Sequence, residues 1–326
     1  MAIAIEHHQK NMPTAIGRAL REANVSMNDI DGVAFTRGPG MAGCLAVAAN
    51  AGRGIAAATN KPIVGVHHMQ AHALTSLLTE SDPPKFPFLT LLVSGGHTLL
   101  LLAYSPTKFK ILATTVDSAI GQAIDSVARL LKLSWHDEHG NLIGAGAALE
   151  RLAASSPPPG VSIPTIKPFP VAFPNLLSFS FAGPKGEVNR MLGKLPPDAV
   201  EKDEGLRIAI ARGFQEAAVA QLEEKVKLAL RWCDKRGVKV NGLVASGGVA
   251  SNMYLRERLT LALRENPEDP IPLICPPPHL CTDNAVMVGW AGLYRFLAKD
   301  HDPFDIDLKS TWSLEDLSSE DVTPSG

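Results

Sequence analysis

The chain has 326 residues, of which 45% are hydrophobic and 20% are charged, a composition typical of a folded globular protein. Its length favours two domains over one. The 31 Lys and Arg residues nearly balance the 33 Asp and Glu residues, and the net charge of −2 excludes a strongly basic wrap for nucleic acid and an acidic tail. The four cysteines form no C-x-x-C pair, which excludes a disulfide scaffold and favours a reducing compartment. No apolar run reaches the roughly 18 residues that a membrane-spanning helix needs, so no membrane is expected as a partner.

Strands and helices are predicted to alternate over the first eighty residues. The pattern indicates a helix at 12–23, a strand at 31–40 ending in a Gly-Pro loop, an Ala/Gly-rich helix at 41–60, a strand at 61–66 and a helix at 67–80. This alternation is typical of a largely parallel sheet. The Pro-rich segment 81–87 is the first predicted domain boundary.

The second part of the chain is predicted to be a further α/β region. In chain order, the expected elements are strands at 88–93, 98–104 and 109–116, helices at 118–133, 147–154 and 203–236, a strand–Gly loop–helix unit at 242–259, a strand at 271–278 and a helix at 282–297. Residues 156–184 are expected to form an ordered loop with short strands. The Ser/Asp/Glu-rich tail from residue 308 is expected to fray.

Two histidines lie one turn apart on the same face of the helix predicted at 67–80. His68 and His72 are spaced so that both imidazoles can hold one metal ion. Spacing alone leaves open a helix start with surface histidines. Met69 and Gln70 occupy the positions between them where a metallopeptidase needs a Glu as general base, so peptide hydrolysis is disfavoured.

Two glycine loops are candidates for anion binding. Ser94-Gly95-Gly96-His97 joins two predicted strands, and backbone N–H groups can converge there because no Cβ intervenes. The segment 246–252 joins a strand to a helix N-terminus, where the helix dipole favours a phosphate. An ordinary hairpin turn and a tight strand-to-helix turn are the alternatives at these two positions.

Three other features of the sequence carry weaker signals. Asp283 begins a predicted helix, where an acidic residue also stabilises the dipole without any further role. Asp125 lies within an apolar helix pattern, so its carboxylate is expected to face a cleft. Cys275, His279 and Cys281 have a spacing that suits zinc poorly, and buried thiols are the preferred interpretation.

Seven segments together resemble the tRNA threonylcarbamoyladenosine synthase family, which is Gcp-like and was formerly called O-sialoglycoprotein endopeptidase. They follow the family's order and are TRGPGMAGCLAVA (36–48), KPIVGVHHMQAHAL (61–74), FPFLTLLVSGGHT (86–98), DSAIGQAIDSVARLLKL (117–133), FSFAG (179–183), ASGGVASNMYLR (245–256) and CTDNAVM (281–287). The segment VGVHHMQAHALTSLL resembles the mitochondrial and bacterial branch.

The resemblance implies an actin-like, sugar-kinase-like α/β fold, with two ribonuclease-H-like domains and a cleft between them. Residues 1–85 and 282–307 would form the first domain with the metal ligands, residues 86–281 the second with the nucleotide-binding loops, and 308–326 the frayed tail. The family's opening strand and its acidic ETSCDDT-like phosphate loop do not occur in the sequence. The first domain is therefore expected to be N-terminally truncated and incomplete.

The resemblance also implies an acyltransferase. The expected reaction moves a threonylcarbamoyl group from threonylcarbamoyl-AMP to the N6 amine of the adenosine next to the anticodon in tRNAs that read ANN codons. One divalent metal ion, iron or zinc, would be held by His68, His72 and Asp283. The positions that match the family's substrate contacts are Val93, Ser94, Gly95, Gly96, His97, Asp125, Gly146 and Asn252.

Several expectations stay open at this point. No catalytic base is assigned, and His97 and Asp125 are only candidates. A catalytically impaired nucleotide- or partner-binding relic is the main alternative, and a metallopeptidase is a remote one. The expected partners are tRNA, threonylcarbamoyl-AMP and a second copy of the chain in a homodimer. Mitochondrial localisation is expected from the branch, with the cytoplasm as alternative because MAIAIEHHQK is not a convincing transit peptide. Basic residues proposed for tRNA contact are Arg129, Lys132, Lys185 and Arg190.

Overall fold

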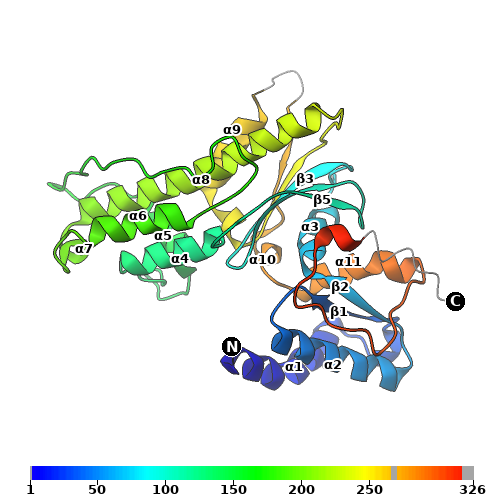
Figure 1. Ribbon diagram of the computed structural model, residues 1–326. Helices are drawn as coiled ribbons and strands as arrows, with labels where there is room; N and C mark the ends of the chain where they lie inside the picture. The colour runs from blue at the N-terminus through cyan, green and yellow to red at the C-terminus, as the bar shows by residue number, and fades with distance from the viewer. Residues whose placement is uncertain (1, 266–269, 318–326) are drawn as a thin grey trace. The chain divides into compact units, whose positions relative to one another are not determined.

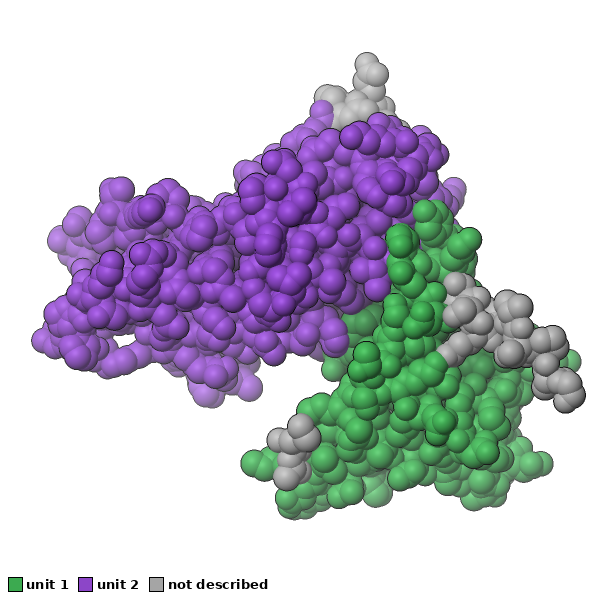
Figure 2. Space-filling model, in the orientation of Figure 1, with its two compact units in different colours: residues 1–83, 104–110, 283–326 green, residues 84–103, 111–282 purple. Residues whose placement is uncertain are grey.

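The computed structural model describes residues 2–265 and 270–317 (Figure 1). The chain divides into two units, shown in separate colours in Figure 2. Unit 1 comprises residues 1–83, 104–110 and 283–326, and unit 2 comprises residues 84–103 and 111–282. The boundaries predicted from the sequence, after residues 85 and 281, lie within two residues of the main boundaries of these units. The short segment 104–110 was not predicted to group with the first unit.

Unit 1 is built from helices around a pair of parallel strands. Its elements are α1 (Ala2–Ala23), η1 (Met27–Asp29), β1 (Val33–Gly38), α2 (Ala42–Thr59), β2 (Ile63–His67), α3 (His68–Thr79), α11 (Ala285–Leu297) and η3 (Leu314–Asp316). Strand β1 pairs with β2 in parallel register, and α11 packs against α3 and both strands. The small residues of α2 allow a close approach to this sheet, where Ala49 and Ala56 pack with Phe35 and Ile63.

Unit 2 is built around a five-stranded sheet with the order β5-β4-β3-β6-β7. Its elements are β3 (Phe88–Val93), β4 (Thr98–Ala103), β5 (Phe109–Thr114), α4 (Ile120–Leu130), α5 (Gly144–Ala154), α6 (Ala182–Leu192), α7 (Ala199–Lys202), α8 (Glu204–Asp234), β6 (Leu243–Ser246), η2 (Gly248–Ser251), α9 (Met253–Leu263), β7 (Leu273–Ile274) and α10 (Pro278–Cys281). The first two residues of β5 group with unit 1.

The central position of β3 in the sheet explains why all of its residues except Thr90 are apolar. The strand pairs antiparallel with β4 on one side and parallel with β6 on the other, so all six residues are buried. The sheet therefore combines an antiparallel pairing of β3 and β4 with parallel pairings of β3 with β6 and of β6 with β7. The α/β fold class predicted from the sequence is therefore confirmed.

The core of unit 2 lies between this sheet and its helices. Leu89, Leu91 and Val93 alternate along β3 and so face the same side, where they join one cluster with residues of α4, α5, α8 and α9. Helix α8 is the longest element, with 31 residues, and begins where Asp203 accepts a hydrogen bond from the Leu206 N–H.

Three predicted elements differ from the structure. Helix α1 begins at Ala2 and not at residue 12, so Pro13 lies inside the helix and not in its first turn. Residues 156–181 contain no strand, although Thr115 and Phe179 form an isolated bridge, and the prediction missed α6 after them. The strand expected at 271–278 is only Leu273–Ile274, because Pro272 and the prolines from 276 onward cannot donate to a ladder.

The predicted fraying of the tail from residue 308 is wrong for the part that the structure describes. Trp312 is 8% exposed and Leu314 is 2% exposed, so residues 308–317 are packed onto unit 1. Residues 318–326 of that predicted tail lie outside the described residues. Within the described chain, no helix combines the length and apolarity required to cross a bilayer.

Candidate functional site

Two histidines project from the first turns of α3. His68 and His72 lie four residues apart, and their ring centroids are 4.8 Å apart. The side chain of His72 is 6% exposed and that of His68 is 16% exposed, so both rings are largely removed from water. The preceding residue, His67, ends β2 and caps α3, because its Nδ1 accepts a hydrogen bond from the Met69 N–H at 3.1 Å.

Asp283 reaches the same point from a segment 211 residues further along the chain. It immediately precedes Asn284, whose side chain caps α11 by accepting a hydrogen bond from Met287 N. Its Oδ1 lies 3.0 Å from His72 Nε2 and 3.3 Å from His68 Nε2. The hydrogen bonds from His68 and His72 hold the pKa of the Asp283 carboxyl well below its usual range, against the opposing effect of burial.

The side chains of this triad fit a divalent cation. One ligand atom from each of His68, His72 and Asp283 lies within 4.8 Å of the others, so a single ion placed among them can reach all three. Two imidazoles and a carboxylate are a donor set that suits zinc or iron. The Nδ1 atom of His72 is buried with no hydrogen-bond partner, so only Nε2 of that ring is committed, and it points to the shared site. Sequence spacing identified the histidines, whereas Asp283 came from the family resemblance.

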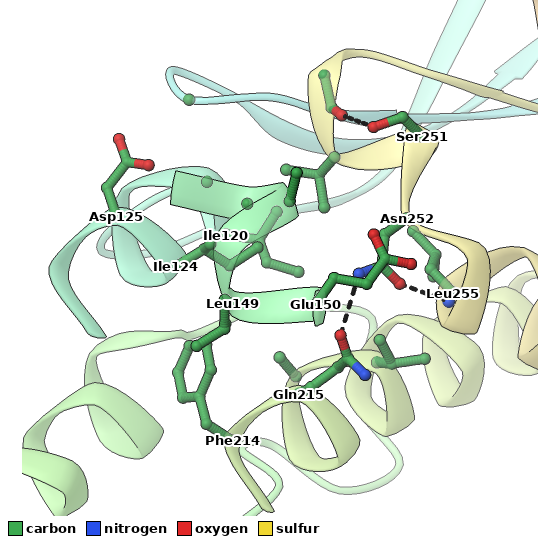
Figure 3. Close-up of a pocket in the computed structure, with 18 of the residues that line it drawn as sticks. Ile120, Ile124, Asp125, Leu149, Glu150, Phe214, Gln215, Ser251, Asn252 and Leu255 are labelled. Atoms are coloured by element: carbon green, nitrogen blue, oxygen red, sulfur yellow. Dashed lines mark hydrogen bonds between the residues drawn. The ribbon is translucent and has the colours of Figure 1, made fainter. Parts of the chain in front are cut away.

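A separate pocket of about 380 Å³ lies within unit 2 (Figure 3). Four of the eight predicted substrate residues line it: Gly95, Asp125, Gly146 and Asn252. Apolar side chains of α4, α5 and α8 form much of its wall, and they include Ile120, Ile124, Leu149 and Phe214. A mostly apolar wall with a few polar groups is typical of a small-molecule pocket.

The other four predicted substrate residues lie at the end of β3 and in the turn that follows it, and they do not line this pocket. Val93 is fully buried at the end of β3, so neither its side chain nor its backbone is exposed to a ligand in this structure. Ser94 Oγ accepts hydrogen bonds from the N–H groups of Gly96 at 3.3 Å and His97 at 3.0 Å. These two N–H groups therefore bind the turn's own serine in the structure, and an anion would have to compete with it.

Two polar residues of the pocket were missed by the sequence analysis. Glu150 follows Gly146 by one helical turn and accepts a hydrogen bond from Met253 N at 2.6 Å. Gln215 Oε1 accepts a hydrogen bond from Asn252 Nδ2 at 3.0 Å, while Asn252 Oδ1 caps α9 by accepting from Leu255 N (Figure 3). The one-turn spacing of Glu150 from Gly146 could have identified Glu150 from the sequence. No pattern in the sequence of α8 marks Gln215.

Residues of the FSFAG segment (179–183) form hydrogen bonds with the part of the chain that precedes α4. Ser180 Oγ and Phe181 N both donate to the Asp117 carboxylate. The Gln221 side chain from α8 accepts from Ser180 N at 2.7 Å and donates to Ser180 O at 2.9 Å. These hydrogen bonds fix the chain just before α4, the helix that carries Asp125 to the pocket.

Three of the four basic residues proposed for tRNA contact have neighbours on the protein itself. Lys132 forms an ion pair with Glu201 at 2.8 Å, and Arg190 forms one with Glu187. The Arg129 guanidinium lies 5.6 Å from the centroid of the Trp135 ring. An RNA phosphate that binds Lys132 or Arg190 would therefore have to displace the carboxylate of Glu201 or Glu187.

Fold and site together define an α/β protein with a His-His-Asp set suited to a divalent cation in one unit and a small-molecule pocket in the other. Comparison with known proteins gives the family. Residues 2–290 match the family described as tRNA N6-adenosine threonylcarbamoyltransferase, TsaD. The chain belongs to this family, as the sequence motifs predicted.

A curated relative supports the same assignment. The probable mitochondrial tRNA N6-adenosine threonylcarbamoyltransferase of Arabidopsis thaliana is 39% identical over 327 aligned positions, which cover 95% of this chain. The chain spans 65% of the length of that relative.

Two solved structures show weak similarity. Component A of the (R)-2-hydroxyglutaryl-CoA dehydratase of Acidaminococcus fermentans has a TM-score of 0.47 and 17% identity, covering 85% of this chain and 81% of its own. The activator of the 2-hydroxyisocaproyl-CoA dehydratase of Clostridium difficile, with bound ADPNP, has a TM-score of 0.39 and 13% identity, covering 73% and 71%. Both similarities are too distant to bear on fold or function.

Proposed function

We propose that this protein transfers a threonylcarbamoyl group from threonylcarbamoyl-AMP to the N6 amine of the adenosine next to the anticodon in tRNAs that read ANN codons. The observation that carries the proposal is the convergence of His68, His72 and Asp283 in a chain that belongs to the tRNA N6-adenosine threonylcarbamoyltransferase family. The named activity of the Arabidopsis relative supports it.

The residues of the triad would hold one divalent metal ion, iron or zinc, through the two Nε2 atoms and a carboxylate oxygen. A bound cation of this kind supplies charge neutralisation and polarisation of a carbonyl. The chain's own contribution is a donor set already gathered at one point, which reduces the reorganisation that binding requires.

The pocket residues would bind and orient the adenylate. Ile120, Ile124 and Phe214 offer an apolar surface to the base. Asn252 donates one amide hydrogen to Gln215, so its second amide hydrogen can be donated to the ligand. Glu150 and Asp125 are acceptors suited to sugar hydroxyls. The adenylate is an activated acyl donor, so no protein nucleophile is needed, and placement of the amine supplies much of the rate. His97 and Asp125 remain the candidates for accepting the amine proton.

Substrates, partners and location belong to the same proposal. The substrates are tRNA and threonylcarbamoyl-AMP, a second copy of the chain is proposed as the partner in a homodimer, and the mitochondrion is the proposed location because the Arabidopsis relative is described as mitochondrial. Peptide hydrolysis has no support at the triad. Met69, which is 4% exposed, stands directly after His68, where a catalytic Glu would be needed, and Gln70 after it donates its amide to the Pro106 carbonyl.

The test is a transfer assay with labelled threonylcarbamoyl-AMP and an ANN-decoding tRNA transcript. The wild-type chain should label the tRNA, and His72→Ala should lower the rate by at least about 100-fold, since it removes a ligand that binding of the metal requires. His8→Ala, which changes an exposed histidine of α1, is the matched control. Binding of the adenylate without transfer by the wild-type chain would favour the relic, and equal rates for wild type and His72→Ala would contradict the role of the triad.

A further inference from the structure

The chain segment 283–312, which includes α11, begins and ends beside the helix that carries the two proposed ligand histidines. It leaves α3 at Asp283, which contacts His68 and His72, and it comes back at Trp312, whose carbonyl oxygen lies 3.2 Å from His67 Nε2. Both ends of the segment 283–312 therefore meet the first turns of α3. We call residues 306–314 the strap.

His67 connects the strap to the start of α3. Its ring is 1% exposed, and its Nδ1 must be the acceptor of the Met69 N–H, since a backbone N–H can only donate. The proton of the neutral ring is then on Nε2, which donates to the Trp312 carbonyl. One side chain thus caps the helix with one nitrogen and holds the strap with the other, next to His68 in the sequence.

Trp312 is itself held in place from several sides. Its ring centroid lies 4.7 Å from that of His67, 5.0 Å from the Arg37 guanidinium carbon and 4.8 Å from the Lys309 ammonium nitrogen. The backbone of the strap also bonds to β1 and the loop after it, through Lys309 N to Arg37 O at 3.0 Å and Gly40 N to Ser310 O at 3.1 Å. Arg37 Nε donates to the Asp307 carbonyl at 2.8 Å.

The strap also lies directly on Gly38. A Cβ at this position would overlap the carbonyl oxygen of Lys309, so only glycine allows the strap to pack where it does. Gly38 is buried at the end of β1, where it is the strand partner of His67, and it is not one of the three proposed ligands. A methyl group here would displace the strap while it leaves His67, His68 and His72 chemically intact.

We propose that His67 and the strap are a positioning device for the metal site. The strap fixes the His67 ring through the Trp312 carbonyl, and His67 in turn fixes the first turn of α3 and the direction of the His68 and His72 rings. Partners of this outer kind orient metal ligands, and their loss weakens metal binding. The inference rests on the proposed metal site, but it does not require that the chain transfers threonylcarbamoyl groups.

The test measures affinity for Co²⁺, followed by its visible absorption and by competition with a chelator, in the full chain. Gly38→Ala, which displaces the strap, should weaken binding roughly tenfold, the lower end of the range for outer-shell changes. His67→Asn should do the same, because asparagine still caps a helix but lacks the ring that reaches Trp312. If Gly38→Ala does not fold, His67→Asn alone carries the test.

Two control variants separate positioning from stability. Gly54→Ala adds a methyl group to α2 where nothing lies within 4 Å, and it should bind Co²⁺ like the wild type. Ile63→Val removes a methylene group from the core of unit 1 and should lower Tm without weakening the affinity.

Three results would overturn the proposal. They are wild-type affinity in both Gly38→Ala and His67→Asn, an equal loss in Ile63→Val, and absence of a Co²⁺ site in the wild-type chain. Failure of transfer in the tRNA assay, with the Co²⁺ affinities as expected, would contradict the proposed reaction and leave the positioning role standing.

Discussion

At the scale of single residues, Asp117 shows how one carboxylate organises the approach to the pocket. It accepts hydrogen bonds from Ser118 N at 2.6 Å, Phe181 N at 3.0 Å and Ser180 Oγ. Partial burial would raise the pKa of this carboxyl, but the hydrogen bonds from Ser180, Phe181 and Ser118 outweigh that effect and lower it. The charged form of Asp117 is therefore favoured by the folded state.

This shift predicts a pH-dependent effect of Asp117→Asn. A pKa that is lower in the folded chain than the ordinary value of about 3.9 stabilises the protein above that value, and the stabilisation is lost as the pH falls through the folded pKa. Because the side chain is largely exposed, we expect a loss of only about 1 kcal/mol near neutral pH. Urea unfolding at about pH 7 and below about pH 4 tests this, with exposed Asp31→Asn as control. A stability difference of the same size at both pH values would contradict the explanation.

At the scale of elements, the packing of α4 against the turn after β3 depends on one glycine. A Cβ at Gly121 would lie 2.6 Å from the Ser94 carbonyl oxygen and 2.8 Å from atoms of Gly95. Both contacts are with backbone, which cannot move aside as a flexible side chain can. The absence of a side chain at Gly121 therefore sets how closely α4, which carries Asp125, approaches the Gly95 turn.

We expect Gly121→Ala to destabilise the protein by about 1–3 kcal/mol and to weaken AMP binding, because α4 must move away from the turn. Gly186→Ala is the matched control, since a methyl group on α6 meets nothing within 4 Å and alanine is the better helix former. Urea unfolding and calorimetric titration with AMP measure the two effects. Unchanged AMP affinity in Gly121→Ala would show that α4 does not set the shape of this pocket.

The sequence predicted the features that depend only on residues close together in the chain. The spacing of His68 and His72 and the apolar run of β3 were readable because a helix face and a buried strand each leave a regular signal. The start of α1 was not, since a proline favours the first turn of a helix while Pro13 lies in the middle of this one.

The parts that could not be predicted depend on contacts between distant segments. Gln215 reaches Asn252 only because α8 packs beside the start of α9, and no periodicity within α8 marks that position. Trp312 is buried by contacts with Arg37 and His67, which lie far away in the sequence. The residues next to Trp312 are rich in Ser, Asp and Glu, and this local composition alone predicted a frayed tail. Asp283 had an adequate local explanation as a helix-start residue, and the family motif was needed to give it a role.

At the scale of the whole molecule, the two proposed binding sites belong to different units. The triad lies entirely in unit 1 and the pocket entirely in unit 2 (Figure 2). Each site is assembled from elements that pack together within its own unit, namely α3 with α11, and α5 with both α4 and α8. Each ligand should therefore stabilise a different set of elements when it is added alone.

Hydrogen exchange measures this separation directly. Zn²⁺ alone should slow exchange in α3 and at the start of α11, because binding stabilises the state that holds the ligands together. AMP alone should slow exchange in α4, α5 and η2. A protection pattern that is the same for both additions, or Zn²⁺ protection confined to unit 2, would contradict the assignment of the sites.

The most direct measurement of the central claim is the anomalous scattering of zinc in a crystal of the chain grown with Zn²⁺. If the triad binds zinc, a strong peak is expected about 2.0–2.2 Å from His68 Nε2, His72 Nε2 and an Asp283 carboxylate oxygen. The same crystal form of His72→Ala should lose that peak. Zinc peaks only at other positions, with none among these three side chains in the wild-type chain, would contradict the proposed metal site.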